Sequence, residues 1–372
     1  RKAVRSAGHI VVTNPDMLHT GILPHHTIWI RLFENLKYVV IDEIHHYRGV
    51  FGSHLANVLR RLRRICQFYG SDPQFICCSA TIANPQELAE HMVGKPFTLV
   101  DNNGAPAGEK HFLFYNPEVV NQELGIRRSA VKEAARIALQ FLDRRVQSIV
   151  FARSRLRVEI LTTYLKEAVR KRGKSHHLVR GYRGGYLPTE RRAIEQGLRQ
   201  GEVMAVISTN ALELGIDIGS LDVCVMTGYA GSVASTWQQA GRAGRKNNLS
   251  LVVLVASSAP LDQYIICHPE YFFEQAPEHA TIDPNNLVVV MSHLKCAAFE
   301  LPFIEGEAFG PDAASTAEML DYLVDQRVLR KVRNKWHWSS ESYPAEEISL
   351  RTAAPGNVVI LDTSDNGRVI GR

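Results

Sequence analysis

Short runs rich in Val and Ile alternate along the chain with segments in which apolar residues recur every three or four positions. The first pattern is typical of buried strands, and the second is typical of amphipathic helices. Because the two patterns alternate to about residue 256, the sequence predicts an α/β fold in which helices wrap a parallel sheet. The predicted strands cover residues 9–13, 38–41, 75–79, 148–151, 203–208, 223–226 and 249–256.

A stretch containing glycine and proline, residues 101–108, interrupts this alternation and predicts a boundary between two lobes. We therefore expect residues 1–104 to belong to a first lobe and residues 105–257 to form a second. The chain starts without Met, and its last residues stop within a strand-rich segment. These ends predict an internal piece of a larger protein, so a targeting segment can lie outside it.

The pattern changes after about residue 257, where proline becomes frequent and aromatic residues cluster. A predicted helix over residues 316–326 is followed by two predicted strands within residues 327–338. A helix followed by a hairpin is compatible with a winged-helix module, so we expect a small α+β domain over residues 258–343. Residues 344–372 are expected to begin a further β-rich domain.

One helix is predicted between the strands at residues 38–41 and 75–79. Its apolar positions recur at helical spacing: Phe51, Leu55, Val58, Leu59, Leu62 and Ile65. This spacing leaves four arginines largely to the opposite face, where solvent or nucleic acid would meet them: Arg60, Arg61, Arg63 and Arg64.

Composition restricts the class of protein. With 45% hydrophobic and 22% charged residues among 372, the chain is expected to fold into more than one domain rather than remain disordered. Its six cysteines form no C-x-x-C pair, which argues for a reducing compartment and against a zinc ribbon. No apolar run approaches the roughly 18 residues of a membrane span. The net charge of +5 permits a polyanionic partner.

An acidic pair follows the predicted strand at residues 38–41, at the sheet edge where open parallel sheets bind ligands. An aspartate such as Asp42 can hold Mg²⁺ on nucleotide phosphates, and an adjacent glutamate such as Glu43 can polarise the attacking water. By itself, such a pair is more often an ordinary turn or helix cap.

Three further polar groups follow predicted strands. Ser79 and Thr81, two small hydroxyl residues, flank Ala80, and Thr209 follows the strand at residues 203–208. Arg242 and Arg245 are three residues apart and share one helix face, from which two guanidinium groups can grip phosphate oxygens. An isolated pair of this kind is usually solvated, but four such groups in this order favour a nucleotide site.

Together these motifs resemble those of superfamily-two helicases of the DEAD/DEAH type. The resemblance rests on TNPDML (13–18), DEIH (42–45), SAT (79–81), IVFARS (149–154), STNALELGIDIG (208–219) and QQAGRAGR (238–245). The sequence is more similar still to MrfA/YprA-type bacterial DNA-repair helicases, in TNPDMLH, DEIHHYRGVFGSHLANVLRRLRRIC, YGSDPQF, SATIANP and YPAEEISLR. This resemblance implies two tandem RecA-like lobes, the first incomplete at its N-terminus, followed by the small α+β module.

The resemblance implies roles for residues of the first lobe. Asp42 would contact Mg²⁺ through water, and Glu43 would activate the water that attacks the γ-phosphate of ATP. The residues coupling the nucleotide state to domain movement would be His45, Ser79, Ala80 and Thr81. The sugar-phosphate backbone of one strand would be held, without readout of its sequence, by Thr13, Asn14 and Pro15.

The resemblance also implies roles for residues of the second lobe. Arg242 and Arg245 would act as arginine fingers, with Gln238 beside them. Gly215 and Asp217 would lie near the nucleotide and the lobe interface. Further contacts to the nucleic-acid backbone would come from Ser208 and Thr209.

The function implied is that of an ATP-dependent DNA helicase or translocase, which uses ATP and Mg²⁺ to move along single-stranded or tailed duplex DNA. The 3′→5′ direction, a role in DNA repair and a bacterial cytoplasmic, nucleoid-associated location follow from the MrfA/YprA-type resemblance alone. Because RNA-acting enzymes share the core motifs, an RNA helicase is one alternative. A non-hydrolysing nucleic-acid-binding module is a second alternative.

The chain departs from the family in one respect, because it has no P-loop before residues 38–41. We therefore expect the 372-residue chain on its own to lack ATPase activity. A relaxed P-loop pattern does occur at residues 168–175. It follows a predicted helix that ends at Gly173 and precedes a predicted strand over residues 176–182. A functional P-loop follows a strand and opens a helix, so we reject it.

Overall fold

The computed structural model describes residues 8–80, 82–102, 104, 108–213, 218, 221–244, 249–274, 278–352, 360–362 and 368–371. The chain divides into two compact units, one formed by residues 1–100 with 279–372 and the other by residues 101–278. The division falls at the start of the predicted linker, and residues 258–278 lie in the second unit. Within the described ranges, no helix has the length and apolar character needed to cross a membrane.

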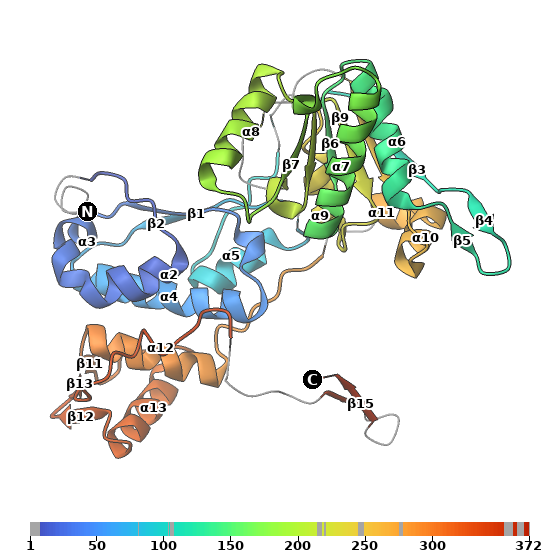
Figure 1. Ribbon diagram of the computed structural model, residues 1–372. Coiled ribbons are helices and arrows are strands. Elements are labelled where there is room, and N and C mark those ends of the chain that lie inside the picture. The colour runs from blue at the N-terminus through green and yellow to red at the C-terminus, as the bar shows by residue number, and fades with distance from the viewer. Residues whose placement is uncertain are drawn as a thin grey trace. The chain divides into compact units, whose positions relative to one another are not determined.

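The second unit is built on a six-stranded parallel sheet with the order β3-β10-β9-β6-β8-β7 (Figure 1). The strands are β3 (Lys110–Tyr115), β6 (Ser148–Phe151), β7 (Val179–Tyr182), β8 (Ala205–Ser208), β9 (Val223–Thr227) and β10 (Ser250–Val255). The five strands predicted for this unit are confirmed as β6, β7, β8, β9 and β10, with small shifts at their ends. The prediction missed β3, an edge strand whose alternately exposed residues give it no continuous Val/Ile run.

Helices cover both faces of this sheet. On one face pack α6 (Ala130–Asp143) and α7 (Arg155–Lys171), and on the other α8 (Pro188–Gln200) and α9 (Val233–Ala240). After α7, Gly173 has a φ of 71°, so residues 168–175 are the end of a helix and not a P-loop. The remaining elements are β4 (Val119–Asn121), β5 (Ile126–Arg127), η4 (His176–Leu178), η5 (Asn210–Leu212), α10 (Pro260–Cys267) and α11 (Pro269–Glu274).

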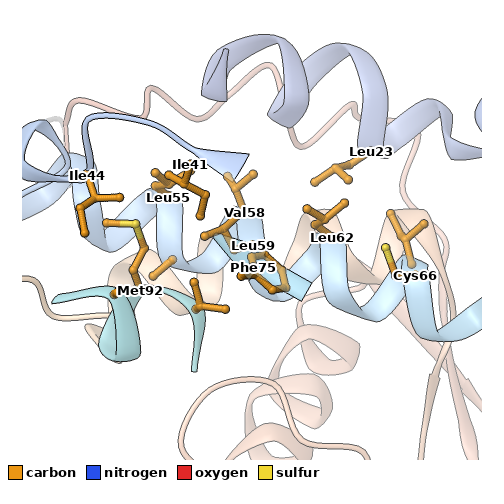
Figure 2. Close-up of a cluster of buried hydrophobic side chains, with 14 of the residues drawn as sticks. Leu23, Ile41, Ile44, Leu55, Val58, Leu59, Leu62, Cys66, Phe75 and Met92 are labelled. Atoms are coloured by element: carbon orange, nitrogen blue, oxygen red, sulfur yellow. The ribbon is translucent and has the colours of Figure 1, made fainter. Parts of the chain in front are cut away.

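The first unit contains two parallel strands, β1 (Tyr38–Ile41) and β2 (Gln74–Cys77), connected through α4 (Gly49–Phe68). The predicted strands and helix are confirmed here. Figure 2 shows their core, in which Val58 and Leu62 of α4 lie in one cluster with Phe75 of β2 and Met92 of α5 (Pro85–Val93). Burying a side chain of this size contributes roughly 1.5–3 kcal/mol, so this cluster fixes the end of β1 firmly.

The strand predicted at residues 9–13 is wrong. Ile10 and Val12 are 84% and 93% exposed, and no described strand pairs with this segment. A strand needs a neighbour to complete its backbone hydrogen bonds, which an apolar pattern alone cannot supply. Short helical segments follow instead: α2 (Pro15–Met17), η1 (Leu18–Ile22), η2 (Leu23–Trp29), α3 (Ile30–Glu34) and, after β1, η3 (Ile44–His46).

Residues 279–352 add a small helical and β-stranded module to the first unit. Helices α12 (Leu287–Glu300) and α13 (Ala313–Asp325) pack with an antiparallel sheet of β11 (Phe303–Ile304), β13 (Lys335–Trp338) and β12 (Leu329–Val332). The predicted helix and hairpin are thus confirmed. Trp336 is 1% exposed at the centre of this core. A separate hairpin is formed by β14 (Ile360–Asp362) and β15 (Arg368–Gly371).

Three of the four arginines, Arg60, Arg61 and Arg64, hold this module against α4, and Arg63 donates a hydrogen bond to the Val93 carbonyl, which corrects the prediction of a solvated or nucleic-acid-binding face. Arg60 donates a hydrogen bond to the Pro284 carbonyl at 2.9 Å, and Arg64 donates one to the Ala297 carbonyl at 2.7 Å. Arg61 is fully buried. The helix is therefore covered on two sides, so polar side chains at the predicted outer face meet protein rather than water.

Arg61 is the centre of a buried network that the sequence analysis missed. Its guanidinium forms an ion pair with Glu300 of α12 and lies 2.6 Å from His19 Nδ1 and 3.3 Å from His293 Nδ1. His293 Nε2 lies 3.0 Å from His54 Nδ1. All five side chains are buried. Because a guanidinium has only donors, both histidines facing it must present an unprotonated Nδ1.

Burial and the neighbouring Arg61 lower the pKa of His19 to about 3 and hold the pKa of His293 well below its usual range. Burial also lowers the pKa of His54. All three histidines are therefore neutral in the folded protein at neutral pH.

We expect the stability of this unit to fall as the pH decreases below about 6.5. Histidines of the unfolded chain take up protons there, whereas His19, His54 and His293 stay neutral in the fold until lower pH. The free energy of unfolding therefore has its full value above the histidine pKa of the unfolded chain. Below that pH, each histidine lowers it by up to about 1.4 kcal/mol per pH unit. Urea denaturation at about pH 7.5 and about pH 5.5 measures this loss. His54→Gln should show a smaller pH dependence, and an unchanged one would contradict the assignment.

Candidate functional site

The acidic pair lies at the carboxyl end of β1, as predicted. Asp42 is exposed, and one of its oxygens accepts a hydrogen bond from the Glu43 amide at 3.0 Å. Glu43 has φ 53° and ψ 46°, a left-handed conformation that is uncommon for residues other than glycine and concentrates at functional sites. This turn directs two consecutive carboxylates to the edge of the sheet.

The donor set at this edge fits Mg²⁺ bound through a nucleotide. No group of three or more metal-ligating side chains exists in the described part of the chain. Mg²⁺ usually retains several waters and needs only one or two carboxylates beside the substrate phosphates. Asp42 is therefore chemically suited to a water-mediated contact with such an ion.

The DEIH turn and the segment after β2 are joined by direct contacts. The Cys78 amide donates to the Ile41 carbonyl, and the Ile44 amide donates to the Cys78 carbonyl, each at 2.9 Å. The Ala80 amide donates to His45 Nδ1 at 3.1 Å. The DEIH turn and the segment after β2, more than thirty residues apart in the sequence, are therefore adjacent. A movement of Asp42 or Glu43 can thus be transmitted to the segment after β2.

His45 is buried and acts as an acceptor in this contact. Burial, followed by the charges of His46 and Arg48, lowers the pKa of His45 to about 4. Its Nδ1 lies 3.4 Å from a Glu43 carboxylate oxygen, which is not an ion pair at neutral pH because the imidazole is neutral. Ser79 is exposed, and its hydroxyl donates to the Ala80 carbonyl at 2.8 Å. Thr81 lies outside the described residues.

Residues 13–15, expected to hold nucleic acid, lie at the start of α2. Thr13 and Asn14 are exposed, and the Asn14 side-chain oxygen accepts a hydrogen bond from the Met17 amide at 2.8 Å. Asn14 is thus also a helix N-cap. The next residue, Asp16, pairs with Arg351 at 2.8 and 3.0 Å, which holds the pKa of Asp16 below its usual value. This pair fixes the segment against the end of the small module.

In the second unit, Ser208 and Thr209 lie at the carboxyl end of β8. The Ser208 side chain is fully buried, and its hydroxyl has no hydrogen-bond partner among the described residues. The Thr209 side chain is partly exposed and accepts a hydrogen bond from the Ala211 amide at 3.4 Å. Of the two, Thr209 is the residue whose side chain reaches the surface. Gly215 and Asp217 lie outside the described residues.

The helix α9 carries Gln238 but ends at Ala240, so the prediction that Arg242 lies on a helix face is wrong. The Arg242 guanidinium is buried and donates two hydrogen bonds to the Glu213 carbonyl, from Nε at 2.9 Å and from Nη2 at 2.5 Å. The Glu213 carboxylate accepts hydrogen bonds from Ser235 Oγ at 2.7 Å and Gln239 Nε2 at 3.0 Å.

These contacts join the QQAGRAGR segment to the STNALELGIDIG segment within the second unit. Glu213 had no role in the sequence analysis, although it lies within the STNALELGIDIG motif. Arg245 lies outside the described residues.

Three family models match successive parts of the chain. The DEAD/DEAH box helicase model matches residues 1–88, and the helicase conserved C-terminal domain model matches residues 133–247. The winged helix domain of ATP-dependent helicase HRQ1 matches residues 282–353. The fold therefore consists of two RecA-like domains and a winged-helix domain, as expected.

Individual relatives extend this similarity over the whole chain. The uncharacterized ATP-dependent helicase YprA of Bacillus subtilis is 62% identical, over 100% of this chain and 49% of YprA. ATP-dependent helicase HRQ1 of Saccharomyces cerevisiae is 39% identical, over 100% of this chain and 35% of HRQ1. The crystal structure of the DUF1998 helicase MrfA bound to DNA matches with a TM-score of 0.91 at 62% identity, over 99% of this chain and 49% of that one.

A second MrfA structure, bound to DNA and AMPPNP, matches with a TM-score of 0.90. The chain spans about half the length of YprA and MrfA and about a third of HRQ1. Its motifs, its fold and these similarities agree, and the chain belongs to the superfamily-two helicases of the MrfA/YprA type.

Proposed function

We propose that the full-length protein is an ATP-dependent DNA helicase or translocase that moves along single-stranded DNA. The observation that carries this proposal is the contact between the DEIH turn and the segment after β2, through His45 and the Ala80 amide. It joins the carboxylates suited to ATP hydrolysis to a segment that can transmit the nucleotide state. The DNA bound in the MrfA structures supports DNA as the track.

In the proposed reaction, Glu43 orients and deprotonates the water that attacks the γ-phosphate. Asp42 would hold Mg²⁺ through water, and the ion would neutralise charge on the phosphates when bound. The second unit supplies Gln238, Arg242 and Arg245 as the groups that stabilise the transferring phosphate. Hydrolysis therefore requires residues from both units, which couples it to their relative movement.

The proposal assigns backbone contacts to residues 13–15 of the first unit and to Ser208 and Thr209 of the second, with Thr209 the better placed of that pair. Gly215 and Asp217 are proposed to act beside the nucleotide. We further propose 3′→5′ movement, a role in DNA repair and a cytoplasmic, nucleoid-associated location, on the basis of similarity to the MrfA/YprA-type helicases.

ATP hydrolysis by the full-length protein with single-stranded DNA, single-stranded RNA or neither tests this proposal. We expect turnover to be stimulated by DNA. Stimulation by RNA alone would instead identify an RNA helicase. The absence of turnover in a protein that still binds DNA would identify a non-hydrolysing binding module, and either outcome would overturn the proposal.

A further inference from the structure

The helix α9 contains only eight residues, Val233–Ala240, yet it carries Gln238 and leads directly into Arg242. Isolated helices of this length are unstable in water, because nucleation is not repaid by so few backbone hydrogen bonds. The placement of Gln238 and Arg242 therefore depends on contacts that anchor α9 from outside the helix.

The strongest of these contacts is at the N-terminus of α9. The two carboxylate oxygens of Glu278 accept hydrogen bonds from the Val233 amide at 2.6 Å and the Ala234 amide at 3.1 Å. The Ser232 hydroxyl accepts the next one, from the Ser235 amide, at 3.0 Å. The first three amides of the helix, which have no partner within it, are thus all satisfied. The carboxylate is also favoured by the positive end of the helix dipole.

The loop before α9 is anchored by a second carboxylate. Asp262 of α10 is fully buried and accepts a hydrogen bond from the Tyr229 amide at 3.2 Å. Arg153 donates to the Tyr229 carbonyl at 3.0 and 2.7 Å and lies 3.3 Å from Asp262. Gly228 has a φ of 87°, and a Cβ there would come within 2.7 Å of Asp262. The loop is therefore held tightly, so the carboxylate of Glu278 meets α9 in a fixed place.

We propose that Glu278 is a positioning residue for ATP hydrolysis, because it fixes the N-terminus of α9 and thereby the placement of Gln238 and Arg242. This inference rests on the proposed ATPase function. Glu278 is the last residue of the second unit before the chain returns to the first. The carboxylate at the end of the second unit is therefore hydrogen-bonded to the helix that carries Gln238 and leads to Arg242.

The variant Glu278→Gln in the full-length protein tests this role. Its amide oxygen can accept one of the two hydrogen bonds, but its NH₂ group faces the other amide and repels it. We expect kcat for DNA-stimulated ATP hydrolysis to fall about tenfold, which corresponds to the loss of one hydrogen bond to a charged group. The KM for ATP and the DNA concentration for half-maximal stimulation should change by less than about twofold, because α9 acts on the transition state.

Glu274→Gln is the matched control. Glu274 is exposed at the end of α11, and its side chain makes no hydrogen bond or ion pair with another described residue, so this variant should behave as the wild type. Ser232→Ala provides a second, milder variant of the same anchor and should lower kcat in the same selective way. If Glu278→Gln does not fold, the kcat of Ser232→Ala is the measurement that tests the inference.

The outcomes separate the inference from the function on which it rests. A wild-type protein without nucleic-acid-stimulated ATPase would overturn the proposed function and the inference with it. An active wild type with normal kcat in Glu278→Gln and Ser232→Ala would overturn the inference alone. Equal losses in kcat and DNA affinity, together with a lower Tm, would show a general stabilising role and would also overturn it.

Discussion

Replacing Glu43 with glutamine in the full-length protein is expected to lower the DNA-stimulated kcat for ATP hydrolysis about a thousandfold. Glutamine has nearly the shape of glutamate but cannot accept a proton from the attacking water. The left-handed turn at Glu43 places the Glu43 carboxylate at the end of β1, and the Glu43 amide donates a hydrogen bond to the Asp42 side chain. The turn needs only the backbone of residue 43, so the variant should fold and bind ATP and DNA normally.

Steady-state ATPase assays, together with equilibrium binding of an ATP analogue and of single-stranded DNA, check this expectation. Glu34→Gln, which removes an exposed carboxylate at the end of α3, is the control and should keep wild-type activity. Turnover by Glu43→Gln within about tenfold of the wild type would mean that another group is the general base.

Much of the fold could be predicted because its strands are buried on both faces. Continuous runs of Val and Ile at β6, β8, β9 and β10 are typical of strands in a parallel sheet whose two faces are both covered by helices. The candidate residues followed from the same pattern, since the carboxyl ends of such strands share one edge of the sheet. Asp42 and Glu43 lie where this reasoning placed them.

The errors have a common physical cause, which is that the sequence pattern does not reveal the tertiary partner. The apolar residues at 9–13 form no strand because no described strand pairs with them. Arg61 is buried because Glu300, more than two hundred residues away in sequence, neutralises it. One signal was present: His54, Val58, Arg61 and Ile65 are four, three and four residues apart and therefore share one face of α4.

The finer geometry of the site was beyond prediction for a related reason. Hydrogen bonds to backbone groups leave no trace in a pattern of residue types. The carbonyl of Glu213 accepts a hydrogen bond from Arg242. The carboxylate of Glu278 accepts one from the Val233 amide at the start of α9, which is 45 residues earlier in the sequence. Sequence motifs identified the segment that contains Gln238 and Arg242, but only the fold shows that its helix ends at Ala240 and which groups determine its position.

Replacing Arg242 with alanine is expected to lower kcat by about a thousandfold or more while ATP binding largely survives, because an arginine finger stabilises charge in the transition state. In this structure, its guanidinium is held by the Glu213 carbonyl within the second unit. Alanine therefore also leaves a buried carbonyl without these donors, which should lower the free energy of unfolding by about 1–3 kcal/mol. The two effects differ in kind, because a loss of stability alone would not lower the kcat of the folded fraction.

Single-turnover ATPase assays on protein shown to be folded by its Tm isolate the catalytic effect. Arg192→Ala removes an exposed arginine of α8 in the same unit and should leave kcat unchanged. Arg242→Lys keeps the positive charge but loses the planar fork that binds two oxygens, so it should recover stability better than activity. Normal turnover by Arg242→Ala would show that Arg242 only ties α9 to Glu213, and the transition-state charge would then have to be met by other groups.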